Sequence, residues 1–304
     1  MRAAFSRAVI ECFSDEDTFF LTGDLGFMAL EEVRACLDRR FINCGVAEQN
    51  MIGVAAGLAR SGFKVFAYSI APFCYARPFE QIRNDICFTA LPVMLGGNGG
   101  GYAYGHMGPT HHALEDCAAM SALPGLRVLV PAFEADLIPL ITRARLGGPA
   151  YLRLGYEARP EGESAPDYAP WRRLLAGETG ALAALGPLAG LAWKTLKDIP
   201  PSERPSVWAV TELPLTEPPE DFLKEATANG LAVMEEHVVQ GGLGMALAYA
   251  LAQRGLRLPK LVHRAALGYP SGRYGSQAFH RRECGLDETG ILAAARELTS
   301  GGSQ

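Results

Sequence analysis

The sequence lacks the features that mark several classes of protein. It has 28 lysines and arginines against 33 aspartates and glutamates, a net charge of −5, so no basic surface favours nucleic acid. No apolar stretch approaches the roughly 20 residues that span a membrane, and the charged N-terminus does not resemble a signal peptide. With 49% hydrophobic and 20% charged residues, the chain is expected to be globular and to bind neither nucleic acid nor a membrane.

Cysteine pairs are also missing. The seven cysteines are scattered, odd in number and without a C-x-x-C pair, which argues against a disulfide framework or a zinc site. Cys44 and Cys74 lie close to the segments discussed below, but a buried cysteine is more often a small apolar filler than a nucleophile. The simplest compartment for such a chain is the cytosol, so we expect a cytoplasmic protein.

What the sequence does contain is an alternation of short apolar runs with helical patterns. The 304 residues correspond to about two domains. In the first half, strands are predicted at 18–22, 65–70, 92–95, 127–130 and 150–154, and helices at 2–13, 47–61, 77–87 and 134–146. This order is typical of a parallel sheet with crossover helices.

A second, smaller unit follows a segment rich in Pro, Glu and Gly, which predicts a linker over 161–179. Its strands are predicted at 181–185, 207–210, 232–235 and 261–265, with a helix over about 243–254. We therefore predict an α/β protein of two doubly wound domains, residues 1–160 and 180–304.

One carboxylate, Glu48, stands at the start of a predicted helix made mostly of small residues. A glutamate in this place is usually solvated and favoured by the helix dipole, so Glu48 alone does not indicate a site. Three further segments follow it in a fixed order. The four are GVAEQ (45–49), APFCYARPFEQIRNDI (71–86), GHMGPTHHALED (105–116) and MEEHVVQGGLGMA (234–246).

With these four segments, nearly the whole chain resembles the C-terminal half of transketolase, as found in split transketolases made of two polypeptides. It is also similar to the matching half of 1-deoxyxylulose-5-phosphate synthase. The resemblance implies a thiamine-diphosphate pyrimidine-binding domain followed by a transketolase C-terminal domain. It also implies the transfer of a two-carbon ketol unit from a ketose to an aldehyde.

The resemblance assigns four residues to the cofactor pocket. Glu48 matches the glutamate that bonds N1′ of the aminopyrimidine and so activates the cofactor, and Phe73 matches the aromatic ring stacked on that heterocycle. Arg77 matches a polar position near the same pocket in the synthase branch, and Asp24 matches an acid at the end of the first strand. Without the resemblance, Phe73 would be a core residue, Arg77 a surface arginine, and Asp24 a turn or capping residue.

The resemblance also assigns a catalytic histidine. His111 follows GPT at 108–110 and matches the family's histidine that points at the reacting carbonyl. Imidazole suits this role because it can donate to a developing alkoxide and return a proton near neutral pH. His112 is either a second polar contact or a loop residue, and His106 is a further candidate for substrate contact.

The part of the family that holds the diphosphate is missing. The family binds it through a metal ion, using a G-D-G motif and a downstream asparagine in a separate domain. The GDLG at 23–26 imitates the motif, but Leu25 replaces its second glycine and Asn50 belongs to the Glu48 segment. The resemblance thus implies no metal ligands in this chain, Mg²⁺ or a similar ion held mainly by an N-terminal partner subunit, and an α2β2 assembly.

Positions on the substrate side depart from classical transketolases. Where the family has an acid, a histidine and a phosphate-binding arginine, this chain has Met107, Gly99 or Gly100, and Tyr156. Methionine accepts a sugar hydroxyl poorly, and tyrosine cannot form the charged fork that grips a phosphate. Arg153 is a candidate replacement unless it lies on the other face of its strand. We therefore predict a non-standard sugar, such as a modified, nucleotide-linked or sulfonated ketose, with Arg153 and Tyr156 as candidate contacts.

Three alternatives stay open: a synthase that decarboxylates a 2-oxoacid, a 2-oxoacid dehydrogenase beta subunit, and a non-catalytic scaffold. In the second domain, the acids Glu235 and Glu236 with His237 are interpreted as structural or interfacial. The basic, aromatic stretch at 269–282 is interpreted as a solvated loop, with substrate contact as the alternative.

Overall fold

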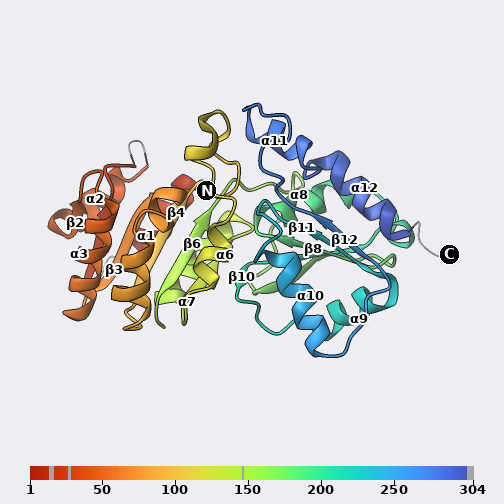
Figure 1. The fold of residues 1–304 in the computed structure, drawn as a ribbon, viewed down its shortest axis with the longest axis horizontal. Helices are drawn as coiled ribbons and strands as arrows, with labels where there is room; N and C mark the ends of the chain where they lie inside the picture. Colours follow the sequence, from red (N-terminus) through yellow and green to blue (C-terminus); the bar gives the residue numbers. More distant parts are fainter. Residues whose placement is uncertain (14–16, 27–28, 146, 300–304) are drawn as a thin grey trace.

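The computed structural model describes the chain except residues 14–16, 27–28, 146 and 300–304. Two α/β domains lie side by side, each built on one mainly parallel sheet (Figure 1). The sheets have seven and five strands. The predicted fold class is therefore confirmed.

The first sheet has one antiparallel edge. Its strands, in spatial order, are β10 (Glu212–Leu213), β5 (Arg127–Leu129), β6 (Ala150–Leu154), β4 (Val93–Asn98), β3 (Lys64–Ile70), β1 (Thr18–Thr22) and β2 (Phe41–Asn43). Strand β10 runs antiparallel to β5, and the other pairs are parallel. Parallel neighbours require crossover connections, which supply the helices on the two faces.

Helices cover both faces of this sheet because its strands are apolar on both sides. In β1, Phe20 packs in the cluster with α1, whereas Leu21 packs in the cluster with α3, as expected for successive residues of a strand. One face carries α1 (Arg2–Phe13), α2 (Glu31–Leu37) and α7 (Leu137–Arg145). The other carries α3 (Glu48–Arg60), α4 (Ala71–Tyr75) and α6 (Asp116–Ser121). Shorter turns are η1 (Asp38–Arg40), α5 (Phe79–Gln81), the π-helix η2 (Ile82–Cys87), η3 (Gly105–Thr110) and η4 (Glu134–Asp136).

The second sheet also has one antiparallel edge strand. In spatial order it comprises β12 (Leu261–Arg264), β11 (Leu231–Met234), β8 (Ala181–Leu185), β9 (Ser206–Val210) and β7 (Trp171–Leu175). Strand β7 runs antiparallel to β9. Its helical elements are α8 (Pro187–Leu196), η5 (Pro201–Glu203), α9 (Glu220–Asn229), α10 (Leu243–Gln253), α11 (Gln277–Glu283) and α12 (Glu288–Thr299).

Several boundaries differ from the prediction. The predicted linker over 161–179 is wrong for Trp171–Leu175, which form β7. The helix predicted at 77–87 begins at Phe79 and continues as the π-helix η2, and the one predicted at 134–146 begins as a 3-10 turn. Residue 146 lies outside the described residues.

The two domains are joined closely. Strand β10 returns from the second half of the chain to pair with β5, and one apolar cluster extends from α3 into the second sheet. The domain limits at 160 and 180 remain predictions. Among the helices that the structure describes, none combines the length and apolarity needed to cross a bilayer.

Candidate active site

Three strand ends of the first sheet meet at one crevice. The chain leaves β1 for β2 on one side and returns to β3 on the other, and ligands bind outside such a switch point. Gly23 follows β1, Glu48 begins the helix after β2, and Ser69 lies near the end of β3. A Cβ added to Gly23 would lie 3.4 Å from Ser69 Oγ and 3.5 Å from Glu48 Oε1. The glycine therefore leaves the Glu48 carboxylate uncovered by a side chain on that side.

Glu48 is 3% exposed, and few donors satisfy its carboxylate. Arg77 donates from Nη1 to Oε2 at 2.9 Å, and Ser69 donates its hydroxyl to Oε1 over a long 3.4 Å. A buried carboxylate offers about four acceptor positions and is costly to bury without donors. Oε1 of Glu48 can therefore accept a further, stronger hydrogen bond.

The guanidinium of Arg77 already makes the two contacts that are expected of the bound aminopyrimidine ring. Cζ of Arg77 lies 3.8 Å from the centroid of the Phe73 ring while the guanidinium donates to Glu48. Stacking on Phe73 and bonding to Glu48 are the two contacts that the resemblance assigns to the aminopyrimidine. Three of the four predicted cofactor residues, Glu48, Phe73 and Arg77, therefore lie together, with Arg77 covering one face of Phe73.

His111 joins the same group. Its ring lies edge-on to Phe73 with centroids 5.2 Å apart, and its Nδ1 lies 2.9 Å from Thr110 Oγ1. Gly108 has φ 72° and ψ −161°, a backbone conformation that favours glycine and turns the chain before His111. A half-exposed imidazole beside Phe73 can donate to or accept from a substrate oxygen.

Asp24 lies at the rim of the crevice, exposed and with φ 60°. Its backbone N–H donates to Asn43 Oδ1 at 3.1 Å, and Asn43 donates from Nδ2 to Asp24 Oδ1 at 2.8 Å. Asn43 Oδ1 also accepts from the N–H of Gly45, in the loop before Glu48. A hollow of about 370 Å³ opens beside this pair. Asp24 thus steadies the loop before Glu48, and Asn43, at the end of β2, is a residue that sequence reasoning missed.

The structure contradicts His112 as a substrate contact. Its side chain is 4% exposed, with Nδ1 2.8 Å from the Tyr269 hydroxyl and Nε2 2.8 Å from the carbonyl oxygen of Gly105. Burial lowers the pKa of His112, so the ring stays neutral at neutral pH. With both nitrogens engaged, His112 is the loop residue of the two alternatives.

Arg153 is also contradicted as a replacement phosphate ligand. It is 5% exposed, and its Nε donates to Asp116 Oδ2 at 2.8 Å. Its Nη2 donates to the carbonyl oxygens of Ala113 and Glu236. The guanidinium of Arg153 therefore lies at the interface between the two domains. His106 and Tyr156 are exposed, and their substrate contacts remain predictions.

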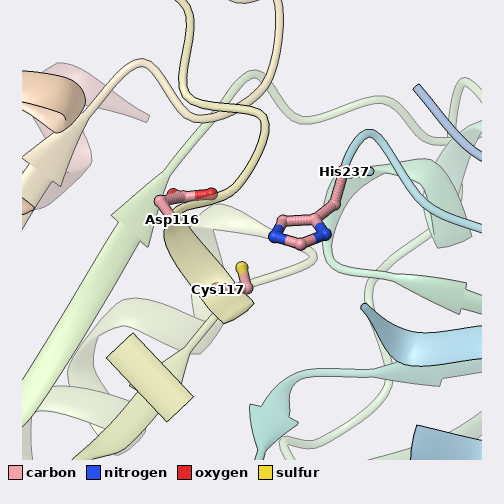
Figure 2. A group of neighbouring side chains, drawn as sticks. All are labelled: Asp116, Cys117 and His237. Atoms are coloured by element: carbon pink, nitrogen blue, oxygen red, sulfur yellow. The ribbon is translucent and has the colours of Figure 1, made fainter. Parts of the chain in front are cut away.

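One buried group, Asp116, Cys117 and His237, has ligand atoms within 4.8 Å of one another. Figure 2 shows His237, from the second domain, turned toward the start of α6. His237 Nε2 accepts from the N–H of Ala118 at 3.2 Å, and Nδ1 lies 2.7 Å from the carbonyl oxygen of Val238.

No metal needs to be invoked for this group. Both His237 nitrogens have partners, and Asp116 is paired with Arg153. Burial, and then the Asp116 carboxylate, raise the pKa of the Cys117 thiol well above its ordinary value, so a thiolate ligand is disfavoured. Burial likewise raises the pKa of Cys74, near Glu48, to about 12. Both cysteines are therefore fillers rather than nucleophiles, as the sequence analysis expects for Cys74.

The chain is similar to known proteins in sequence and in fold. The model of the transketolase pyrimidine-binding domain matches residues 1–158. The chain is 29% identical to one subunit of an apulose-4-phosphate transketolase of Phocaeicola vulgatus, covering 98% of this chain and 96% of that one. It is 31% identical to a 1-deoxy-D-xylulose-5-phosphate synthase of Geobacter metallireducens, over 86% of this chain but 43% of the synthase. A solved structure titled "Split gene transketolase, inactive beta4 tetramer" superposes with a TM-score of 0.80 at 30% identity, over 98% of this chain and 97% of that one.

Proposed function

This chain belongs to the transketolase family, and from that premise we propose that it is the C-terminal subunit of a split, thiamine-diphosphate-dependent transketolase. The reaction is the transfer of a two-carbon ketol unit from a ketose to an aldehyde. The observation that carries the proposal is the buried Glu48 carboxylate, with acceptor capacity left on Oε1. It is connected through Arg77 to Phe73, and the Phe73 ring contacts His111.

The residues present fit the aminopyrimidine end of the cofactor. When bound, thiamine diphosphate supplies a carbon nucleophile that attacks a ketose carbonyl. Glu48 would bind the ring nitrogen N1′ and hold its proton, and Phe73 would stack on the face of the aminopyrimidine ring. His111 would donate to the substrate oxygen and take the proton back. Arg77 would have to leave the face of Phe73 that it covers.

We propose that a separate N-terminal subunit holds the diphosphate and Mg²⁺, in an α2β2 assembly. The GDLG at 23–26 lacks the second glycine of the family's motif, and Asp24 is bonded to Asn43. The names of the relatives support this division, since one is named as a single subunit of its transketolase and another is a split-gene transketolase whose β4 tetramer is titled inactive. The cytosolic location also remains a prediction.

We propose a ketose other than the usual pentose phosphates as the donor. Met107 and Tyr156 stand at positions where classical transketolases have an acid and an arginine, and they are 56% and 53% exposed. The relative named for apulose 4-phosphate makes that ketose a first donor to test. The similarity to synthases keeps a decarboxylating carboligase as the second candidate.

The decisive experiment mixes the purified chain with a candidate N-terminal subunit that carries the G-D-G motif. Such a subunit is expected to have about 250–300 residues, which corresponds to roughly two domains at most. With thiamine diphosphate and Mg²⁺, ketol transfer is expected only when both polypeptides are present. Cofactor and Mg²⁺ binding by the isolated chain would refute the split architecture. Carbon dioxide release from pyruvate would identify the synthase, and turnover of xylulose 5-phosphate at ordinary transketolase rates would refute the non-standard donor.

Arg77→Met is expected to tighten cofactor binding by the reconstituted pair. A half-exposed ion pair contributes up to about 1 kcal/mol, so removing its competition corresponds to about a fivefold lower Kd. The Kd can be measured by fluorescence quenching titration. Arg83→Met is the matched control, because Arg83 is exposed on η2 and bonds its neighbour Asn84. A higher Kd in Arg77→Met would instead make Arg77 a contact of the bound cofactor.

A further inference from the structure

The loop that carries His111 is closed at its base and tied to the second domain. Gly101 and Ala113 form an antiparallel bridge, with N–H to O distances of 2.8 and 3.0 Å. His111 lies within this loop, residues 101–113, which is yellow in Figure 1 and lies beside α11. Whatever holds the two ends of the loop therefore sets where His111 points.

Glu236 holds the first end. Its carboxylate is 6% exposed, and Oε1 accepts from the N–H of Tyr102 at 2.6 Å and from Gln277 Nε2 at 2.8 Å. Oε2 accepts from Nε of Arg281 in α11. A Cβ on Gly101 would lie 2.5 Å from Oε1, so the loop approaches the carboxylate as closely as only a glycine allows.

Glu236 also reaches the second end through its backbone. Its carbonyl oxygen accepts from Arg153 Nη2 at 2.9 Å, and the same Nη2 donates to the carbonyl oxygen of Ala113 at 2.8 Å. One residue of the second domain is therefore bonded, directly or through one arginine, to both ends of the loop. Charge-assisted bonds in a buried place are strong and directional, which suits a positioning role.

We propose that Glu236 is a positioning residue of the active site, fixing loop 101–113 and hence His111. This inference rests on the proposed function and extends it: the second domain contributes to the reaction through this carboxylate. It also revises the interpretation of residues 269–282 as a solvated loop. Tyr269 bonds His112, and the Gly275 carbonyl oxygen and Ser276 Cα lie 3.2 and 3.3 Å from a Cβ built on Gly105.

The chain supplies a matched control in Glu235. It is buried like Glu236, but its carboxylate bonds the N–H groups of Leu243 and Gly244 and the ring of His263, all in the second domain. Glu235→Gln and Glu236→Gln are the same chemical change at adjacent residues. In Glu236→Gln, one of the two carboxylate oxygens is replaced by an NH₂ group, which cannot accept a hydrogen bond. In one orientation of the amide the NH₂ faces the donors of Tyr102 and Gln277, and in the other it faces the Nε donor of Arg281.

The first readout needs no cofactor. Amide hydrogen exchange of the full chain is expected to rise about tenfold or more across residues 101–113 in Glu236→Gln, and to stay unchanged there in Glu235→Gln. The second is kinetic: in the reconstituted pair, kcat should fall about 10- to 100-fold in Glu236→Gln while the Kd of the cofactor is unchanged. Gln277 is half-buried and supplies one of the donors to Glu236 Oε1. Gln277→Ala is therefore the milder variant and should show both effects to a smaller degree.

Unchanged loop exchange in Glu236→Gln would overturn the proposal, and so would faster exchange with an unchanged kcat. An equal fall in kcat in Glu235→Gln would overturn it as well, because the loss would then follow the stability of the domain. If the wild-type pair proved inactive, the proposed function would fail. Amide hydrogen exchange alone would then test whether Glu236 fixes loop 101–113.

Discussion

Replacing Glu48 with glutamine is expected to lower kcat of the reconstituted pair by about 10²- to 10⁴-fold, the usual contribution of a positioned acid or base. Glutamine has nearly the same shape, so it can keep the contact with Ser69 at the crevice between β1 and β3. It cannot hold a proton at the ring nitrogen of the cofactor as a carboxylate does. Initial rates at saturating cofactor measure the effect.

Two outcomes would contradict this expectation. Glu80, exposed on α5, gives the control variant Glu80→Gln, which should keep wild-type activity. If Glu48→Gln matched it, Glu48 would be an ordinary helix-start residue. If neither the variant nor the wild type were active but both bound the partner equally, the scaffold alternative would be favoured over an enzyme.

Much of the fold follows from local patterns in the sequence. Predicted strands 18–22, 150–154 and 181–185 and helix 2–13 have the bounds found in the structure. Segments 150–154 and 181–185 are short, nearly continuous apolar runs, and every residue of β6 and β8 is buried, as expected for central parallel strands. Such elements are specified by their own residues.

Two of the strands that the sequence analysis does not predict, β7 and β10, depend on distant partners. Strand β7, WRRLL, reads as polar, but Arg172 is buried and donates from Nη2 to Asp136 Oδ2 of the first domain at 2.6 Å. Strand β10 has only two residues and exists because β5 offers an edge to pair with. Pairing over such a separation leaves no local signal in the sequence.

The candidate site also combines residues that the sequence motifs identify with residues that they do not. Glu48, Phe73, Arg77 and His111 were identified by motifs in a fixed order, and the structure brings them together. Gly23 and Ser69 were missed, although small residues at strand ends of a switch point are the available signal. The motif leaves the role of His112 open because it gives a residue's place in a loop but not the direction of its side chain.

Arg153→Met is expected to destabilise the isolated chain by about 3–5 kcal/mol, because it leaves a buried charge without its partner. Asp116 is fully buried and has Arg153 and Tyr151 as side-chain donors. Urea denaturation measures the change. Arg173→Met is the matched control: Arg173 is 43% exposed and pairs with Glu225 at the surface, so its effect should stay within about 1 kcal/mol.

The same variant separates the two interpretations of Arg153. A substrate ligand would raise KM and leave stability nearly unchanged, whereas a structural ion pair lowers stability, with any change in KM secondary to it. The double variant Asp116→Asn with Arg153→Met should be less destabilised than the sum of the two single variants, because it removes the unpaired charge. A strictly additive loss would show that the two side chains act independently. In that case, the joint that holds loop 101–113 would have to depend on the bonds from Arg153 to Ala113 and Glu236 rather than on the ion pair.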